Sequence, residues 1–236
     1  MCASLVVNLA RAGADVIELG IPYSDPLADG PVIQAASQRA LESGVTPLFV
    51  MDVVALVRRE SDVPIVLMTY YNPVLRRGLA RFADEATKAG ADGVILTDLP
   101  PDEARPWLAE ADRTGMATQF LLAPTSNDDR IRLVASHMKR GFVYCVSRTG
   151  VTGARSDVPA DLSSLMDRIR AATELPICVG FGVSTPEHVA RIAAIADGAV
   201  IGSALVDFLS RNSSSATLDF DLNAIVSDWK KATRRS

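Results

Sequence analysis

Two carboxylates in the first thirty residues are placed where they could carry out acid–base chemistry. Glu18 lies inside the apolar run 16–19, which is typical of a buried strand. A buried charge is costly unless another group pairs with it or a reaction uses it. The run leads into a proline-rich loop that carries Asp25 and Asp29. A carboxylate near a strand end, followed by a stiff acidic loop, is a common way for an α/β enzyme to present a catalytic pair.

The alternation of side chains along a strand predicts the direction in which Glu18 points. If Ile17 and Leu19 face the covering helices, Glu18 faces the opposite side of the sheet, towards the axis of a barrel. The structural alternative is a buried acid that pairs with an Arg or Lys of another strand. None of the predicted strands contains a basic residue, so we favour a catalytic role for Glu18.

The other acids near strand ends are more ambiguous. Asp29 directly precedes a Gly-Pro pair and a predicted helix, so helix capping and catalysis are both open for it. Asp25 precedes Pro26, which favours a turn. Asp98 lies at the end of another predicted strand, and we expect it to support the site or to form the turn before two prolines.

Glycine-bearing loops follow three successive strands in the last third of the chain. Gly153 lies in the first of these loops, Gly182 ends the next strand, and Gly202 with Ser203 precedes a helical stretch. Backbone N–H groups of such loops and of a helix N-terminus bind anions. In β/α barrels a phosphate site commonly follows the last two strands. Tight turns are the alternative, but three successive loops favour a phosphate site.

The aromatic residues and histidines give weaker signals. Tyr144 lies within an apolar strand, where packing in the core is the default and a site role comes second. Tyr70 lies at a strand end, closer to the expected mouth of the barrel. His137 and His188 fall on predicted helices, and no metal site follows from them.

Short β-branched strands alternate strictly with helices, which predicts a parallel sheet with helical crossovers. The predicted strands number seven and cover residues 14–20, 64–70, 93–99, 117–124, 142–147, 176–182 and 198–204. Ala, Asp and Gly recur just before three of them, in the segments AGADVIEL, AGADGVIL and IADGAVIG, and we expect a short loop with Asn72-Pro73 and a Ser-rich linker over 210–217. A closed barrel of this type needs eight strands, and this chain opens on a helix over residues 2–12. The simplest interpretation is an α/β fold, a (β/α)8 TIM barrel without its first N-terminal β-strand, formed as a single domain by residues 1–236. A seven-stranded open sheet is the alternative.

Composition excludes several classes of function. The 236 residues are 48% hydrophobic, which supports a large core, and the net charge of −4 argues against non-specific binding to nucleic acid or to an anionic membrane. The three cysteines show no zinc spacing and fit reduced thiols in the cytoplasm. No apolar run approaches the roughly 20 residues of a membrane span, and we see no signal peptide. We therefore expect a cytoplasmic protein with no nucleic-acid or membrane partner.

Five segments resemble blocks of a known family. ELGIPYSDPLADGP (18–31) is similar to the signature of the tryptophan synthase alpha chain family. Further similar blocks follow in the correct order, so that the resemblance covers residues 1–209: YYNPV (70–74), CVSRTGVTGAR (145–155), VGFGVSTPEHV (179–189) and GAVIGSALV (198–206). The resemblance implies a (β/α)8 barrel that cleaves indole-3-glycerol phosphate to indole and glyceraldehyde 3-phosphate.

The resemblance also implies roles for individual residues. Glu18 would be the general acid/base of a retro-aldol cleavage, and Asp29 would hydrogen-bond the indole N–H and stabilise positive charge. The residues implied to hold the substrate phosphate are Gly153, Gly182, Gly202 and Ser203. Those implied to close over the site or to line it are Thr152, Tyr70, Tyr144 and Phe181. The implied partner is a tryptophan synthase beta chain in an alpha2-beta2 complex; pyridoxal phosphate is expected only in that beta chain, and no cofactor in this one.

One departure from the family pattern keeps two alternatives open. Family members carry a first strand that closes the barrel, so the strands at 14–20 and 198–204 are expected to leave unpaired edges here. We predict that a polypeptide of residues 1–236 is poorly soluble or weakly active. The alternatives are a catalytically impaired barrel that binds and activates a beta chain, and another phosphate-binding β/α-barrel lyase or isomerase. A Schiff-base aldolase would need a lysine near a strand end, and no predicted strand has one.

Overall fold

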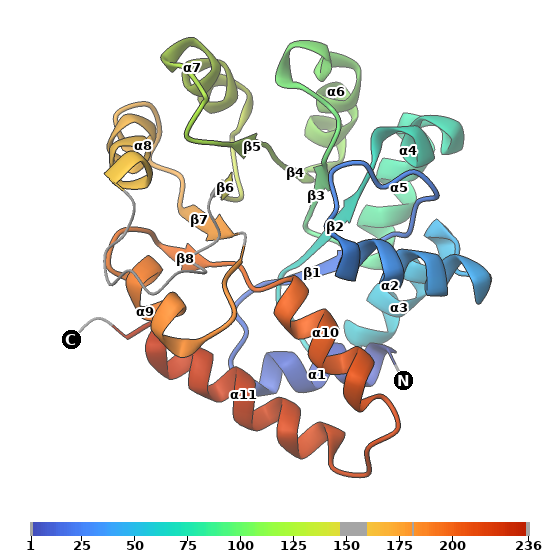
Figure 1. Cartoon of the computed structure of the whole chain (residues 1–236). Helices are drawn as coiled ribbons and strands as arrows, with labels where there is room; N and C mark the ends of the chain where they lie inside the picture. The colour runs from blue at the N-terminus through green and yellow to red at the C-terminus, as the bar shows by residue number, and fades with distance from the viewer. Residues whose placement is uncertain (1, 147–159, 181, 235–236) are drawn as a thin grey trace.

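A computed structural model describes residues 2–146, 160–180 and 182–234, in which parallel strands are surrounded by helices (Figure 1). The strands are β1 Ile17–Gly20, β2 Ile65–Thr69, β3 Gly93–Leu96, β4 Ala117–Gln119, β5 Leu121–Leu122, β6 Val143–Val146, β7 Ile177–Gly180 and β8 Gly198–Ala199. The helices are α1 Cys2–Ala12, α2 Pro31–Glu42, α3 Pro47–Val57, α4 Tyr71–Arg77, α5 Leu79–Ala89, α6 Arg105–Thr114, α7 Asp128–His137, α8 Ala160–Arg170, α9 Pro186–Ala193, α10 Ser203–Asn212 and α11 Leu218–Ala232, with a 3-10 turn at Pro101–Glu103.

The strands form two parallel four-stranded ladders, β1-β2-β3-β4 and β5-β6-β7-β8. Phe120 alone separates β4 from β5, and its carbonyl accepts a hydrogen bond of 3.2 Å from the Tyr144 N–H. One predicted strand, 117–124, therefore passes from the first ladder into the second. The chain is a (β/α)8-type TIM barrel, as predicted. Within the described residues β1 and β8 stand at the outer ends of the ladder order, which confirms the two edges that the strand count predicts.

Apolar side chains pack on both faces of the strands. The larger cluster lies between strands and helices and includes Ile17. The smaller cluster fills the barrel interior and is built on Val66, Ile95, Phe142 and Tyr144. Glu18 is paired in register with Val66, and directly paired residues of neighbouring strands share a face. The side chain of Glu18 therefore points into the barrel, as the alternation predicts.

The repeated Ala-Asp-Gly sequences before strands have a structural function. Asp92, just before β3, accepts hydrogen bonds from the Ile65 N–H at 2.7 Å and from Arg58 at 2.6 Å. The same arrangement recurs at the start of β8, where the residues involved are Asp197, Ile177 and Arg170. Each aspartate thus joins the first residue of the neighbouring strand to the helix that precedes that strand, which fixes the N-terminal end of the barrel.

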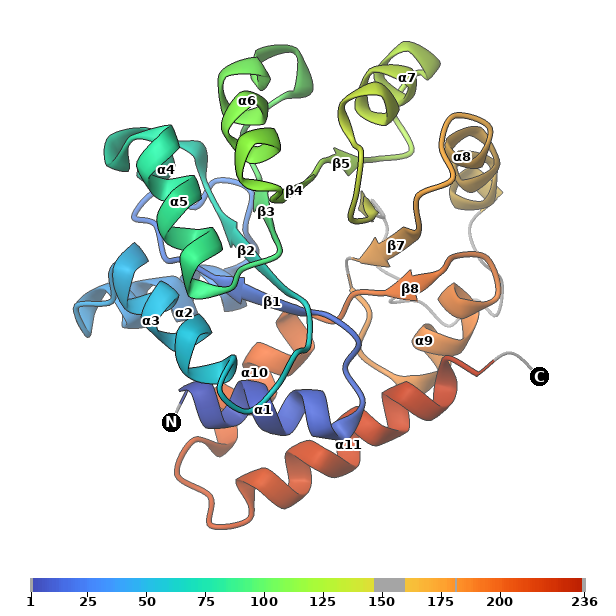
Figure 2. The ribbon, with the colours of Figure 1, turned by 180° about the vertical axis from the view of Figure 1, so that it is seen from behind.

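Helices α1 and α11 lie side by side at one end of the molecule, as both views show (Figure 1, Figure 2). Lys230 of α11 pairs with Asp15 at 2.6 Å. The C-terminal helix therefore anchors the segment that leads from α1 into β1 and Glu18.

Two predicted boundaries were wrong. A loop was expected around Asn72 and Pro73, but these residues belong to α4. Proline is tolerated in the first turn of a helix, because N–H groups there have no partner within the helix. Helix α10 extends to Asn212, into the Ser-rich segment that was expected to be a linker.

Within the described residues, no single helix is long and apolar enough to cross a membrane. The helices α2 and α3 meet the criteria of length and hydropathy only when taken together, and they are bent by 98° at their junction.

Candidate active site

Glu18 is the titratable group at the centre of the candidate site. Glu18 as a whole is partly exposed, in keeping with the outer position of β1. Its Oε1 atom, however, is shielded from solvent and has no hydrogen-bond partner among the described residues. Burial raises the pKa of Glu18 to about 7. No described strand contains a basic residue that could pair with it. A carboxyl group with this pKa exchanges a proton readily near neutral pH.

Tyr144 and Cys178 share the interior space with Glu18. They are paired in register on β6 and β7, and the Glu18 charge raises the pKa of each, after the larger effect of burial. Tyr144 is 8% exposed. A Cβ atom added at Gly180 would lie 2.5 Å from the Tyr144 hydroxyl, so this glycine makes room for the tyrosine ring. Residue types alone did not single out Gly180 or Cys178, because their role depends on which strands are neighbours.

Asp29 lies in the acidic loop, residues 21–30, between β1 and α2. It does not cap α2: the capping position belongs to Gly30, and no side chain makes a cap hydrogen bond there. The structure thereby excludes one of the two interpretations that the spacing left open. Burial raises the pKa of Asp29, and a hydrogen bond from the Tyr70 hydroxyl opposes this effect. Asp29 is thus a partly buried carboxylate whose pKa the Tyr70 hydroxyl lowers, and it is not a helix cap.

Asp98 supports the same region, as expected. Its Oδ1 accepts a hydrogen bond of 2.6 Å from the N–H of Tyr71, the first residue of α4. A carboxylate at this position satisfies an N–H group that has no partner within the helix. Asp25 is exposed in the turn, where its carbonyl accepts from the Leu27 N–H at 2.9 Å.

The glycines after β7 and β8 leave room for an anion. Gly182 has a φ of +77°, a conformation that side-chain-bearing residues rarely adopt. Gly202 is the N-cap residue of the ten-residue helix α10, which starts at Ser203. A Cβ atom added at Gly202 would meet nothing within 4 Å. Free space at a helix N-terminus is what a phosphate group needs. Three predicted site residues lie outside the described residues: Thr152, Gly153 and Phe181.

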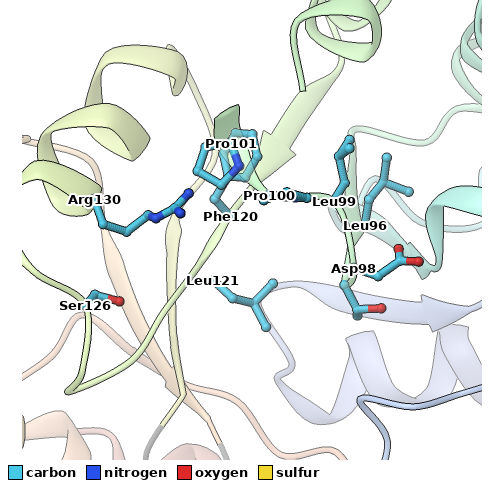
Figure 3. Close-up of a pocket in the computed structure, with 10 residues that line it drawn as sticks. Leu96, Asp98, Leu99, Pro100, Pro101, Phe120, Leu121, Ser126 and Arg130 are labelled. Atoms are coloured by element: carbon cyan, nitrogen blue, oxygen red, sulfur yellow. The ribbon is translucent and has the colours of Figure 1, made fainter. Parts of the chain in front are cut away.

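Two cavities lie at the carboxyl ends of β2 and β3, and Glu18 lines neither of them. The first, about 350 Å³, runs from the end of β3 to the start of α7 and is lined by residues that include Leu96, Phe120 and Arg130 (Figure 3). The second, about 310 Å³, lies against the acidic loop and is lined by Tyr23, Asp25, Leu27, Ala28, Tyr70 and Asp98. Asp98 lines both cavities and stands between them.

Among the described residues, no three His, Cys, Asp or Glu side chains come together as a metal site would require. Cys2, Cys145 and Cys178 are free thiols.

Comparisons with known proteins identify similar chains. The family model described as tryptophan synthase alpha chain matches residues 1–234. The tryptophan synthase alpha chain of Geobacter sulfurreducens is 53% identical over 229 residues, which cover 97% of this chain and 86% of that protein. The tryptophan synthase alpha chain of Solibacter usitatus is 48% identical over 227 residues, which cover 96% of this chain and 85% of that protein.

Solved structures give the same result. The crystal structure of tryptophan synthase subunit alpha from Legionella pneumophila superposes with a TM-score of 0.89 at 36% identity, covering 98% of this chain and 86% of that one. A structure of Mycobacterium tuberculosis tryptophan synthase superposes with a TM-score of 0.89 at 37% identity, covering 99% of this chain and 87% of that one.

Proposed function

The chain belongs to the tryptophan synthase alpha chain family, and from that premise we propose that Glu18 and Asp29 are its catalytic acids. The family is a lyase of tryptophan biosynthesis that cleaves indole-3-glycerol phosphate to indole and glyceraldehyde 3-phosphate. The observation that carries the assignment is the contrast between the two carboxyl groups. Among the described residues Oε1 of Glu18 is buried without a partner, whereas Asp29 is less deeply buried and the Tyr70 hydroxyl lowers its pKa against the effect of burial.

Glu18 acts as the general acid and then as the general base. In its protonated form it delivers a proton to C3 of the indole ring, which places positive charge on the ring nitrogen. The resulting carboxylate takes the proton of the glycerol hydroxyl next to the bond that breaks. The carbon–carbon bond then cleaves, its electron pair returns to the ring, and the hydroxyl becomes the aldehyde of glyceraldehyde 3-phosphate. Glu18 ends the cycle protonated, as it began, and a pKa of about 7 suits both steps.

Asp29 has the complementary role of a fixed anion. Its carboxylate accepts a hydrogen bond from the indole N–H, and this bond strengthens when the ring nitrogen becomes positively charged. Because the interaction is stronger in the transition state than in the bound substrate, it lowers the barrier to reaction. The hydroxyl donor from Tyr70 favours the charged form that this role requires.

The remaining predicted residues bind or enclose the substrate. Gly182, after β7, and Gly202 and Ser203, at the start of α10, hold the phosphate through backbone N–H groups, and the free space beside Gly202 supports this role. Tyr144 lines the interior next to Glu18. The proposed roles of Gly153 in phosphate binding, of Thr152 in closure and of Phe181 in lining the site stay predictions.

The alpha chain works in a complex with a beta chain. It needs no cofactor for its own reaction, and pyridoxal phosphate belongs to the beta chain. We propose in addition that residues 1–236 form a single domain and that the protein is cytoplasmic. The free thiols of Cys145 and Cys178 on adjacent strands support a reducing compartment.

A turnover assay on indole-3-glycerol phosphate tests the proposal. The chain, assayed with a family beta chain, is expected to release glyceraldehyde 3-phosphate, and Glu18→Gln is expected to lower kcat by roughly 100-fold or more. Asp29→Asn is expected to lower kcat, with the affinity for glyceraldehyde 3-phosphate retained because the phosphate end is intact. Unchanged turnover in Glu18→Gln would remove Glu18 from the mechanism. If the unaltered chain gave no more product than Glu18→Gln, the catalytically impaired barrel would be the better interpretation.

A further inference from the structure

Gln119 places an amide group inside the barrel. It lies in β4, is 2% exposed, and is paired in register with Ile95, which belongs to the cluster that fills the barrel interior. Directly paired residues share a face, so the side chain of Gln119 points into the barrel. Its Oε1 atom is shielded from solvent and has no hydrogen-bond partner among the described residues. A buried amide oxygen without a donor is costly, so the position of Gln119 indicates that a further group supplies one.

Two glycines leave room for the carboxamide of Gln119. A Cβ atom added at Gly93, the first residue of β3, would lie 2.9 Å from its Nε2 atom and 3.0 Å from its Oε1 atom. A Cβ atom added at Gly141, shortly before β6, would lie 2.5 Å from the same Nε2. A side chain at either position would therefore displace the amide. The carboxamide thus occupies space that the fold keeps free for it beside β3.

This carboxamide lies in the same row of interior positions as Glu18. Glu18 is paired in register with Val66 of β2, and Val66 is paired with Gly93 of β3. The backbones of Glu18 and Gly93 are two strands apart, which is a distance of roughly 10 Å. The side chain of Glu18 covers part of this distance, and one water bridges two oxygen atoms that lie about 5.5 Å apart. A single water between the two side chains therefore fits the spacing of the strands.

The two side chains also need the same kind of partner. Oε1 of Glu18 and Oε1 of Gln119 are both shielded from solvent, and neither has a hydrogen-bond partner among the described residues. An amide oxygen and an ionised carboxylate can only accept hydrogen bonds, so they cannot satisfy each other. A water molecule has two hydrogens to donate and can satisfy both oxygens at once.

We propose that one internal water donates hydrogen bonds to Oε1 of Glu18 and to Oε1 of Gln119, and that Gln119 is a positioning residue that acts on Glu18 through this water. The positioning role rests on the proposed function of Glu18. Because the water occupies Oε1, the proton that is exchanged with the substrate is carried by Oε2. A hydrogen bond from water favours the charged form of a carboxyl group, so the water limits the rise in the pKa of Glu18 that burial causes.

Few groups near Glu18 can obscure its titration. The neighbouring strand β2 carries no titratable residue. The titratable side chains that share the interior are Tyr144 on β6 and Cys178 on β7. Burial raises the pKa of both, that of Cys178 to about 12, so neither changes its charge near neutral pH. A titration near pH 7 in the barrel interior therefore reports on Glu18.

The first test compares Gln119→Met with Thr118→Val in the full chain. Methionine fills a similar volume but is a much weaker acceptor, so it does not hold the water. Thr118→Val is the matched control, because Thr118 is also buried in β4 but bonds the Trp107 indole N–H, at 3.0 Å, on the other face of the strand. The titration of the Glu18 carboxyl is followed by 13C NMR, with its signal identified by its loss in Glu18→Gln.

We expect the midpoint of this titration to rise by about one pH unit in Gln119→Met, the size of one hydrogen bond to a charged group. The basic limb of the kcat profile, measured with a family beta chain, should move to higher pH by the same amount. Thr118→Val should leave both midpoints where they are in the unaltered chain. A Glu18 midpoint that does not move in Gln119→Met, or that moves equally in Thr118→Val, would overturn the inference.

A high-resolution crystal structure of the unaltered chain gives a second test that does not depend on the stability of any variant. The inference requires an ordered water within about 3.2 Å of both Oε1 atoms. If the water is missing there, the inference is wrong and the proposed function stands. If Glu18→Gln keeps full turnover, the proposed function fails, and the positioning role of Gln119 fails with it.

Discussion

Replacement of Glu18 by glutamine should stabilise the chain while it removes activity. The ordinary pKa of a glutamate is 4.5, and burial raises that of Glu18 to about 7. Each tenfold change in proton affinity corresponds to about 1.4 kcal/mol. The folded chain therefore loses roughly 3 kcal/mol of stability when it holds Glu18 in its charged form. Glutamine has a similar shape and never becomes charged, so it avoids this cost.

The sign of the pH dependence follows from proton binding. Between pH 4.5 and 7 the folded chain keeps its proton on Glu18 while the unfolded chain loses it. The free energy of unfolding therefore falls as pH rises through this window, and above about pH 7 the contribution of Glu18 is constant. The difference between the unaltered chain and Glu18→Gln should be small at pH 4.5 and should grow to roughly 3 kcal/mol by pH 8.

Urea unfolding of both proteins at four pH values measures this difference, with the midpoint and the slope recorded each time. The comparison at each pH cancels the contributions of the other titratable groups, which the two proteins share. Asp29→Asn serves as the control, since Asp29 is less deeply buried and receives a hydrogen bond. A stability difference that does not change with pH, or a glutamine variant less stable at pH 8, would refute the argument that burial sets the pKa of Glu18.

Three further substitutions test the frame around the site. Asp92→Ala removes the acceptor for the Ile65 N–H and for a neighbouring arginine, so we expect the free energy of unfolding to fall by about 1–3 kcal/mol; an unchanged urea midpoint would contradict this role. Gly180→Ala places a methyl group 2.5 Å from the Tyr144 hydroxyl, so the tyrosine ring must move. We expect the free energy of unfolding to fall by about 1–3 kcal/mol and kcat to fall as well. Normal turnover would show that Tyr144 can shift without loss of activity. Gly202→Ala adds a methyl group to open space, so the thermal unfolding midpoint should be unchanged. The KM for indole-3-glycerol phosphate and the inhibition constant of inorganic phosphate should both rise. An unaltered KM would argue against a phosphate at this position.

The sequence predicted those parts of the site that depend on local periodicity. The direction of Glu18 follows from the alternation of a single strand, and the pairing of Glu18 with Val66 confirms it. The absence of basic residues from the described strands could be predicted, because it needed only the list of strands. The repeated Ala-Asp-Gly segments were visible as repeats, but their role at Asp92 depends on an N–H group 27 residues away.

The interpretation of Asp29 could not be settled in the same way. A carboxylate before Gly-Pro and a helix satisfies the sequence rules for a cap, and nothing local excludes that function. What excludes it is the structure: Gly30 takes the capping position, and no side chain makes a cap hydrogen bond at the start of α2. The same limit applies to Gly180, whose lack of a side chain matters only because Tyr144 is paired alongside on β6.

Two carboxyl groups that serve one reaction need different surroundings, and the fold supplies these by two different means. The strand β1 carries Glu18 into an apolar interior, where Oε1 has no donor among the described residues, so its proton is held up to about neutral pH. The acidic loop returns over the strand end, where the Tyr70 hydroxyl accepts a hydrogen bond from the Ala28 N–H and lowers the pKa of the neighbouring Asp29. Burial without a donor produces a proton carrier, and burial with a donor favours an anion. The ten residues between Glu18 and Asp29 thus span both environments, because the strand ends and the chain turns across the mouth of the barrel.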